Sequence, residues 1–315
     1  MSSNYDASLH GYLRVSIFLS VGMSTALLPL MVFLIVKKSD MMKRYRWYLL
    51  NTIVFCYAYH FILCANQITA FYPSYCFMFD PIVPISRDES IFSFYVAFFA
   101  IINLDLSIVW SLFYRFLQAF PGRFGDFFER GRVIYLIYFG LVHLFCYLSV
   151  LIPTYLGQVR GEETTRRQFL AENPDLLALA DAPLLCFANS ENSRRFQLFL
   201  AILFSVFFVI GIGMMVVLIH RTHRTKRESV VKSTYRLQMM LVRALSFQMG
   251  IGMICLLIPV VVLGFLIYNQ ATTGMRMACE RLYFSFHGVL DYCTMIYFIT
   301  PWKRVVMGWL PLKGE

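Results

Sequence analysis

Long apolar runs separated by short polar segments set the organisation of the chain. About 20 apolar residues span a lipid bilayer as a helix, and seven runs reach roughly that length. They cover residues 13–36, 47–71, 91–114, 133–153, 196–219, 237–268 and 280–300. The sixth run exceeds a membrane span, so its first residues are expected to continue the helix outside the membrane. The pattern predicts an all-α membrane protein, a seven-transmembrane helix bundle over residues 13–301.

Composition supports this prediction and leaves little of the chain for a soluble domain. Hydrophobic residues make up 59% of the sequence and charged residues 15%, whereas soluble domains carry about 25% charged residues. The net charge of +10 would by itself suit a nucleic-acid-binding protein. Because the cations lie in short segments between apolar runs, they indicate membrane topology instead, and we expect no nucleic acid partner.

The distribution of cations predicts the orientation of the chain in the membrane. Most of the 28 Lys and Arg residues fall in three connections and the C-terminal segment, namely 37–46, 115–132, 220–236 and 302–315. Cytoplasmic segments next to membrane helices are enriched in Lys and Arg. We therefore expect residues 1–12 to be extracellular and residues 302–315 to form a short cytoplasmic tail.

The connection 154–195 is the one long polar segment, and it is predicted to lie outside the cell. Within it, residues 162–180 are expected to form a short amphipathic helix broken near Pro174. Long loops in compact domains are often functional. This one is expected either to cover an outer pocket or to act as a solvated spacer.

Three cysteines lie in or near segments predicted to be extracellular: Cys76, Cys186 and Cys279. Disulfides form in oxidising compartments, and three cysteines allow three pairings with one thiol left over. We favour the pair Cys76–Cys186, with three free thiols as the alternative. The remaining cysteines lie inside apolar runs, where a thiol behaves as a small hydrophobic group.

Two carboxylates and a histidine interrupt the apolar runs. Asp105 in the third run and Asp291 in the seventh are each expected about 15 Å from the inner end of a helix that rises about 1.5 Å per residue. His287 lies one turn from Asp291 on the same helix face. A charged side chain at the bilayer centre costs about 2.5–3.5 kcal/mol, so these groups must face protein or water. They are expected either to take part in a ligand-binding site or to form a structural hydrogen-bond network.

The outer half of the third run carries an apolar stripe in line with Asp105. Phe94, Phe98 and Ile101 share the face of that residue at helical spacing. Such a stripe is suited to lining an apolar cavity that binds a small ligand. The alternative is ordinary packing between helices, which needs the same spacing of apolar side chains.

Cations also gather at the inner ends of the third, sixth and seventh runs. They are Arg115, Arg236, Arg243, Lys303 and Arg304. They are expected either to attract anionic lipid or to face a cytoplasmic partner whose docking depends on the spread of the helices. Trp302, which precedes two of these cations, is typical of a residue that anchors a helix end at the membrane surface.

Sequence signatures of enzymes do not occur in the chain. It has no GxSxG, HExxH, Walker or glycine-rich dinucleotide-binding motif. His220 and His223 are spaced by one helical turn but have no carboxylate or thiol neighbour that would complete a metal site. We therefore expect no catalytic residues, no metal site and no cofactor.

Segments of the last two runs resemble a known family. STYRLQ at 233–238 leads into the sixth run, which contains Gln248 and Pro259. The seventh run contains SFHG at 285–288 and is followed by PWKR at 301–304. These segments resemble the sixth and seventh helices of nematode serpentine chemoreceptors of the Str superfamily, most closely those of class H. The seven-helix layout extends the resemblance to the whole chain.

The resemblance implies a rhodopsin-like, seven-helix G-protein-coupled receptor that senses small molecules at the cilia of chemosensory neurons. Arg115 falls where the family carries an Arg at the end of the third helix. Asp291 replaces a small hydroxyl residue, and Trp302 replaces a Tyr. We therefore expect a small-molecule ligand on the extracellular side and a heterotrimeric G protein as the cytoplasmic partner.

Two other functions stay open on the residues alone. Asp105, Asp291 and the buried histidines could form a proton or cation path in a transporter or a ligand-gated channel subunit. Many transporters contain inverted repeats, and none is visible in this sequence. A structural membrane scaffold is the second alternative, and it would lack a large cavity among the outer halves of the helices.

Overall fold

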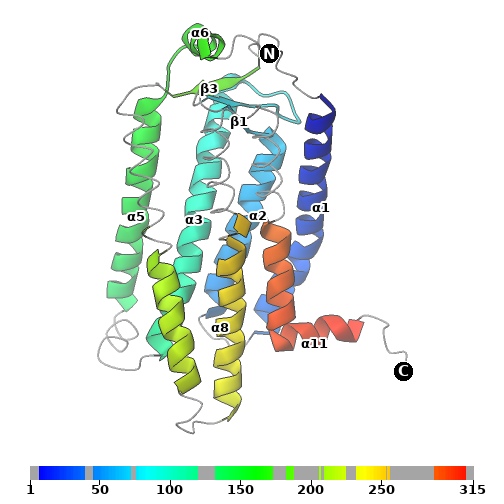
Figure 1. Cartoon of the computed structure of the whole chain (residues 1–315), viewed down its shortest axis with the longest axis vertical. Helices are drawn as coiled ribbons and strands as arrows, with labels where there is room; N and C mark the ends of the chain where they lie inside the picture. Colours follow the sequence, from blue (N-terminus) through cyan, green and yellow to red (C-terminus); the bar gives the residue numbers. More distant parts are fainter. Residues whose placement is uncertain are drawn as a thin grey trace.

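Long helices lying side by side make up most of the structure. The computed structural model describes residues 7–39, 45–71, 76–119, 132–172, 182–187, 206, 209–224, 232–252, 254–255 and 287–309. The labelled long helices are α1 (Ala7–Lys37), α2 (Tyr45–Asn66), α3 (Arg87–Ala119), α5 (Arg132–Gly157) and α8 (Lys232–Gly252). Residues 209–224 and 287–298 are also helical. Successive helices along the chain run in opposite directions (Figure 1).

Within the described residues, four helices are long and apolar enough to cross a membrane. They are Arg14–Lys37, Tyr45–Asn66, Arg87–Leu117 and Ile137–Gly157, and they coincide with the first four predicted runs. The other three predicted runs lie partly outside the described residues, and α8 and the helical residues 209–224 and 287–298 fall at least partly within them. Helix α1 and the helical residues 287–298 end on the same side of the bundle, because Trp302, just after residues 287–298, donates to Ser39, just after α1.

The second predicted run ends earlier as a helix than its hydropathy suggests. Helix α2 stops at Asn66, and Gln67 has a positive φ of 44°, a backbone conformation that interrupts a right-handed helix. Residues Thr69–Phe71 then form strand β1. The prediction of helix over residues 67–71 is therefore wrong. The backbone groups of Thr69–Phe71 pair with strand Cys76–Met78 instead of forming helical hydrogen bonds.

Helix α3 begins four residues before its predicted start because its first turn is capped. The Ser86 backbone N–H donates to Glu89 Oε2 at 2.7 Å, and the Glu89 N–H donates to Ser86 Oγ at 3.3 Å. This reciprocal pair is a capping box, which satisfies amide groups that the first turn leaves unbonded. The cap places Arg87 at the first helical position, next to the sheet.

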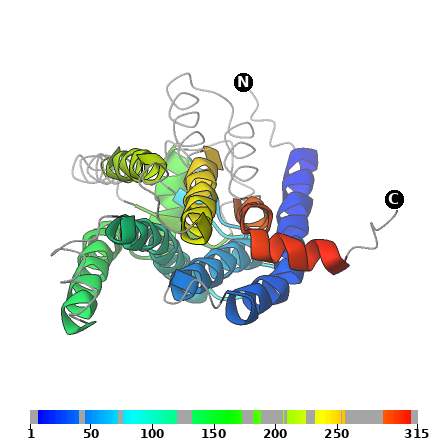
Figure 2. The ribbon, with the colours of Figure 1, turned by 90° about the horizontal axis from the view of Figure 1, so that it is seen from below.

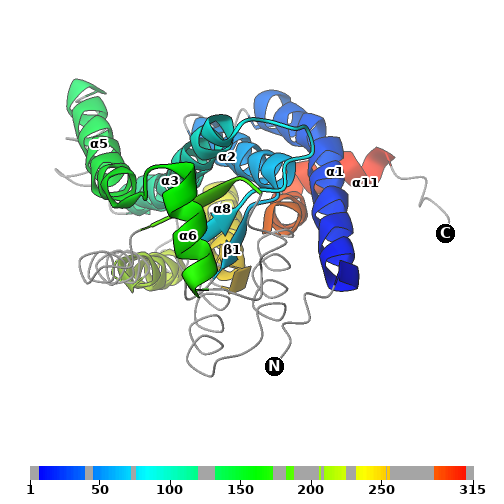
Figure 3. The same ribbon diagram turned by 90° about the horizontal axis from the view of Figure 1, so that it is seen from above.

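A small antiparallel sheet closes one end of the bundle, which we call the sheet end. Its strands are β1, β2 (Cys76–Met78) and β3 (Leu184–Cys186), in the order β1-β2-β3. Helix α6 (Glu162–Glu172) lies against β3, and from above the two are seen in front of the helix ends (Figure 3). The predicted helix over 162–180 is confirmed for residues 162–172, and its remainder lies outside the described residues.

Helix α11 (Thr300–Trp309) lies across the opposite end of the bundle, which we call the α11 end (Figures 1 and 2). Its Trp302 is fully buried, and the indole N–H donates to Ser39 Oγ at 3.0 Å. Ser39 in turn donates to the Leu34 carbonyl oxygen at 2.9 Å. The prediction of Trp302 as an anchor at the membrane surface is therefore wrong, because Ser39 at the end of α1 gives the indole a buried acceptor.

The inner cluster is an apolar core at the α11 end that joins four parts of the chain. It contains residues from α1, α2, α8 and the segment 292–302: Met31, Leu34, Ile35, Tyr45, Leu49, Ile53, Leu241, Ala244, Tyr292, Met295, Ile299 and Trp302. All of these side chains are buried. The cluster therefore fixes α11 to the first and second helices of the bundle.

Candidate functional site

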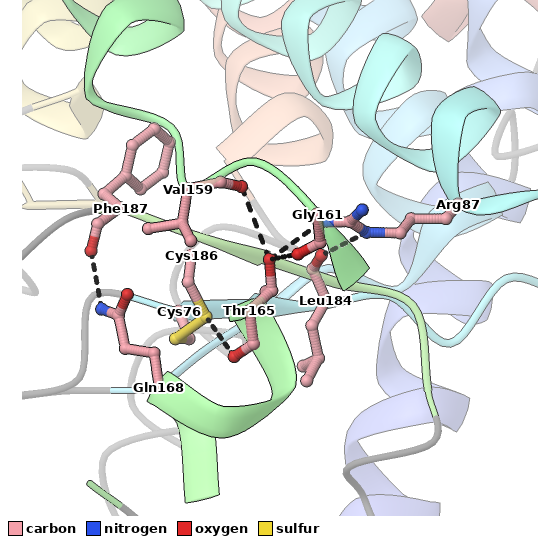
Figure 4. Close-up of a disulfide and its surroundings, with 9 residues drawn as sticks. All are labelled: Cys76, Arg87, Val159, Gly161, Thr165, Gln168, Leu184, Cys186 and Phe187. Atoms are coloured by element: carbon pink, nitrogen blue, oxygen red, sulfur yellow. Dashed lines mark hydrogen bonds between the residues drawn. A yellow bond between two sulfur atoms is a disulfide. The ribbon is translucent and has the colours of Figure 1, made fainter. Parts of the chain in front are cut away.

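The sheet and α6 are held together by the disulfide Cys76–Cys186, the pair favoured from the sequence (Figure 4). The two cysteines face each other in the register of β2 and β3. Arg87 adds a second link, because its Nε donates to the Leu184 carbonyl at 3.2 Å and its Nη2 to Thr165 Oγ1 at 2.9 Å. The first residue of α3 therefore positions both β3 and α6 at the sheet end.

Beneath the sheet lies a cluster of aromatic rings that contains two of the candidate ligand-binding residues. Phe94 is buried, with its ring centroid 4.7 Å from that of Phe98 and 5.0 Å from that of Phe77 in β2. Phe79 and Phe187 complete the cluster from the sheet side. Two residues of the apolar stripe predicted on α3, Phe94 and Phe98, thus lie directly beneath the sheet.

The remaining candidates on α3 lie further from the sheet. Ile101 and Asp105 are half-buried, and neither belongs to the aromatic cluster. Asp291 on the helix 287–298 is buried, and the side chain of Gln248 in α8 lies within hydrogen-bonding reach of it. Among the described residues, no electrostatic interaction links Asp105 to Asp291. The structure therefore brings Asp291 to α8 and leaves Asp105 apart.

The first turn of the helix 287–298 packs on α2 through two histidines and a thiol. The His60 and His287 rings are parallel within 10°, with centroids 6.1 Å apart. Cys56 Sγ lies 3.7 Å from His60 Nδ1 and 4.0 Å from His287 Nδ1. His60 Nδ1 lies 2.7 Å from the Cys56 carbonyl oxygen, which can only accept, so this nitrogen carries the proton. All three side chains are buried.

Gly288 permits this close packing because it has no side chain. A Cβ at this position would lie 3.1 Å from His60 Cε1 and 3.2 Å from Cys56 Sγ. One turn closer to α11, Tyr292 donates from its hydroxyl to the Ile53 carbonyl oxygen at 3.1 Å. The helix 287–298 therefore follows α2 from Gly288 to Tyr292.

We expect Gly288→Ala to lower the free energy of unfolding by about 1–3 kcal/mol, because the added methyl group overpacks the contact with α2. The loss should appear as a lower melting temperature of the purified protein. Gly250→Ala in α8 is the matched control, since nothing lies within 4 Å of a Cβ there. In a helix, that control should be neutral or stabilising by about 0.5–1 kcal/mol. Equal melting shifts for the two variants would contradict the close approach.

At the α11 end, the candidate cations differ in their surroundings. Arg115 is 7% exposed, and its guanidinium carbon lies 3.8 Å from the centroid of the Tyr45 ring. Lys303 and Arg304 on α11 are exposed, with Lys303 Nζ 4.4 Å from the Tyr297 ring centroid. Arg243 on α8 is also exposed. The side chain of the last candidate, Arg236, lies outside the described residues.

Several contacts of this region were not anticipated from the sequence. Cys56 lies inside an apolar run, and Tyr45 belongs to no motif or charged pattern that would mark it. The spacing of Cys56 and His60 by four residues, on one helix face, was the available signal for the first. No group of His, Cys, Asp and Glu in the described part of the chain is arranged to hold a metal ion.

Comparison with known families agrees with the helix arrangement. The model of the family described as "Serpentine type 7TM GPCR chemoreceptor Srh" matches residues 11–312, which is nearly the whole chain. The match includes every described helix from α2 to α11 and all but the first residues of α1. No curated protein matches the chain significantly.

Proposed function

The chain belongs to the Srh family of serpentine seven-transmembrane G-protein-coupled chemoreceptors, and on this premise we propose how it acts. The receptor binds a small molecule that enters from the sheet end and activates a heterotrimeric G protein at the α11 end. The sheet end faces the outside of the cell, with residues 1–12 extracellular and residues 302–315 cytoplasmic. The proposed location is the membrane of a sensory cilium.

The ligand contacts the outer half of the bundle in this proposal. The contacting residues are Phe94, Phe98, Ile101 and Asp105 on α3 and His287 and Asp291 on the helix 287–298. The position of two of these phenylalanines beneath the disulfide-linked sheet supports the assignment. A site that combines apolar rings with a few polar groups suits a small, largely apolar molecule.

The observation that carries the proposal is that the helix 287–298 contacts both α2 and α8. In its first turn it packs on α2 at Gly288, and further along Asp291 reaches Gln248 of α8. Its Phe298 stacks on Phe247 of α8 with ring centroids 4.2 Å apart. A ligand that binds one arrangement of these helices more tightly than another therefore changes the position of α8 at the α11 end.

The G protein docks on the cations of the α11 end. The residues assigned to this surface are Arg115, Arg236, Arg243, Lys303 and Arg304. Exposed cations attract an acidic or carbonyl-rich partner surface and increase its rate of association. The exposure of Arg243, Lys303 and Arg304 supports their part in this surface.

The test is ligand-dependent nucleotide exchange by purified receptor in lipid nanodiscs, measured against a panel of Gα subunits with a library of small apolar and weakly polar compounds. At least one compound should accelerate exchange. Phe98→Ala should raise its half-maximal concentration about tenfold or more, since each 1.4 kcal/mol of lost contact is tenfold in affinity. Arg167→Gln, on the exposed face of α6, is the control and should leave the response unchanged. Compound binding without exchange on any Gα would overturn the proposed coupling.

A further inference from the structure

The cation at the inner end of α3 is packed against an aromatic ring. Arg115 is buried, and its guanidinium lies over Tyr45 at 3.8 Å, closer than any other cation is to a ring centroid within the described residues. A guanidinium over the face of an aromatic ring is attracted by the negative potential of that face, and burial strengthens the attraction. The ring of Tyr45 therefore favours the withdrawn position of Arg115.

Tyr45 is held in place on its other sides. The ring is 1% exposed and belongs to the inner cluster with Trp302 and Ile299. It also stacks on Tyr114, the residue before Arg115, with centroids 6.2 Å apart and planes within 14°. Because the tyrosine is fixed by a packed core while the arginine has a flexible stem, separation of the two requires Arg115 to move.

We propose that the Tyr45 ring clamps Arg115 in the resting receptor, and that the G protein docks only when Arg115 leaves this ring. This inference rests on the proposed function, because it describes how the cytoplasmic surface of that receptor is controlled. In the clamped position the guanidinium is buried, and so its planar fork of N–H groups cannot reach a docking G protein. When the inner end of α3 moves away from Tyr45, the first residue of α2, Arg115 is released.

The physical size of the effect is sufficient for a switch. A desolvated cation–π contact contributes about 2 kcal/mol, which corresponds to a bias of about 30-fold toward the clamped arrangement. A ligand must overcome this bias through its differential affinity for the released arrangement. Loss of the ring should therefore raise activity that does not depend on ligand.

The first experiment measures basal nucleotide exchange on the responsive Gα, normalised to receptor at the cell surface. Tyr45→Leu removes the ring and keeps an apolar side chain, and it should raise basal exchange about tenfold or more. Tyr45→Phe keeps the ring face and removes only the hydroxyl, which lies within hydrogen-bonding reach of Arg115, so it should raise basal exchange clearly less than Tyr45→Leu. Tyr48→Leu is the matched control, since Tyr48 packs on Tyr114 at 5.4 Å but is not the ring beneath Arg115. Tyr45→Met is measured if Tyr45→Leu fails to reach the surface.

The second experiment tests the contact without a G protein. A double-mutant cycle of Tyr45→Leu and Arg115→Met is followed by thermal unfolding of the solubilised receptor, and the two melting shifts should not be additive. Additive shifts, or unchanged basal exchange for Tyr45→Leu in a receptor that responds to ligand, would overturn the clamp alone. The other negative outcome is non-additive melting shifts together with no nucleotide exchange by the wild type or any variant, with or without ligand. That outcome would overturn the proposed function and leave Tyr45–Arg115 a structural contact.

Discussion

Replacement of Trp302 by alanine is expected to lower the free energy of unfolding by about 3–5 kcal/mol, the range observed when a large buried aromatic side chain is truncated. Trp302 is fully buried in the inner cluster, so alanine leaves a cavity among the ends of α1, α2 and the segment 292–302. The substitution also leaves Ser39 Oγ without the indole donor. Thermal unfolding of purified receptor in detergent measures the effect.

Two variants separate the contributions of volume and hydrogen bond. Trp302→Phe keeps most of the ring volume and should lose only about 1–2 kcal/mol, mainly from the missing N–H donor. Trp47→Ala removes a tryptophan that is 56% exposed on α2, and it should cost about 1 kcal/mol or less. If Trp302→Ala unfolded at the same temperature as Trp47→Ala, the buried position of Trp302 would be wrong.

Removal of the disulfide by Cys76→Ser or Cys186→Ser is expected to have the second largest effect, about 2–4 kcal/mol. A cross-link over about 100 residues contributes about 4.7 kcal/mol in the chain-entropy description, and the two cysteines are 110 residues apart. The expected value is lower because α3 and α5 lie between them, and membrane helices already restrict the unfolded chain. The loss should appear as a lower melting temperature and faster proteolysis of α6.

Cys293→Ser is the control for the loss of a thiol, because Cys293 is free and exposed on the helix 287–298. Its effect should stay within about 0.5 kcal/mol, as for surface substitutions in general. The double variant Cys76→Ser with Cys186→Ser should resemble either single variant, since each already removes the whole bond. A Cys76→Ser protein as stable as Cys293→Ser would contradict the importance of the bond for the sheet.

The parts of the fold that follow from local pattern could be predicted from the sequence. Hydropathy identifies α1, α2, α3 and α5, because a helix in lipid must be apolar over the thickness of the bilayer. The position of α6 follows from its mixture of charged and apolar residues. The ends of helices follow less well, because polar residues outside the membrane can continue a helix, as in α3, which reaches Ala119.

Apart from the disulfide pair, the parts of the fold that depend on distant residues could not be predicted. Each strand of the sheet has three residues, and β3 follows its partner β2 by more than a hundred positions. Trp302 pairs with Ser39, which is 263 residues away along the chain. Nothing near Trp302 distinguishes it from an interfacial tryptophan, because the deciding acceptor belongs to another helix.

The residues of the candidate site also divide into those that the sequence identifies and those that it does not. Charge inside apolar runs identified Asp105, Asp291 and His287, since such residues are costly in lipid. The partners Cys56 and Tyr45 carry no such signal, because thiols and tyrosines occur throughout membrane helices. The need for Gly288 depends on the distance between two backbones, which local sequence does not encode.

The separation of β2 from β3 along the chain also sets an order of events during biosynthesis. Ribosomes add about 5–20 residues per second, so the 110 residues between the two cysteines take roughly 6–22 s to synthesise. In the proposed orientation, Cys76 is during this interval a free thiol on the oxidising lumenal side, while α3 and α5 enter the membrane. Oxidoreductases that act too early would pair Cys76 with another thiol, so the yield of correctly folded receptor depends on the timing of oxidation.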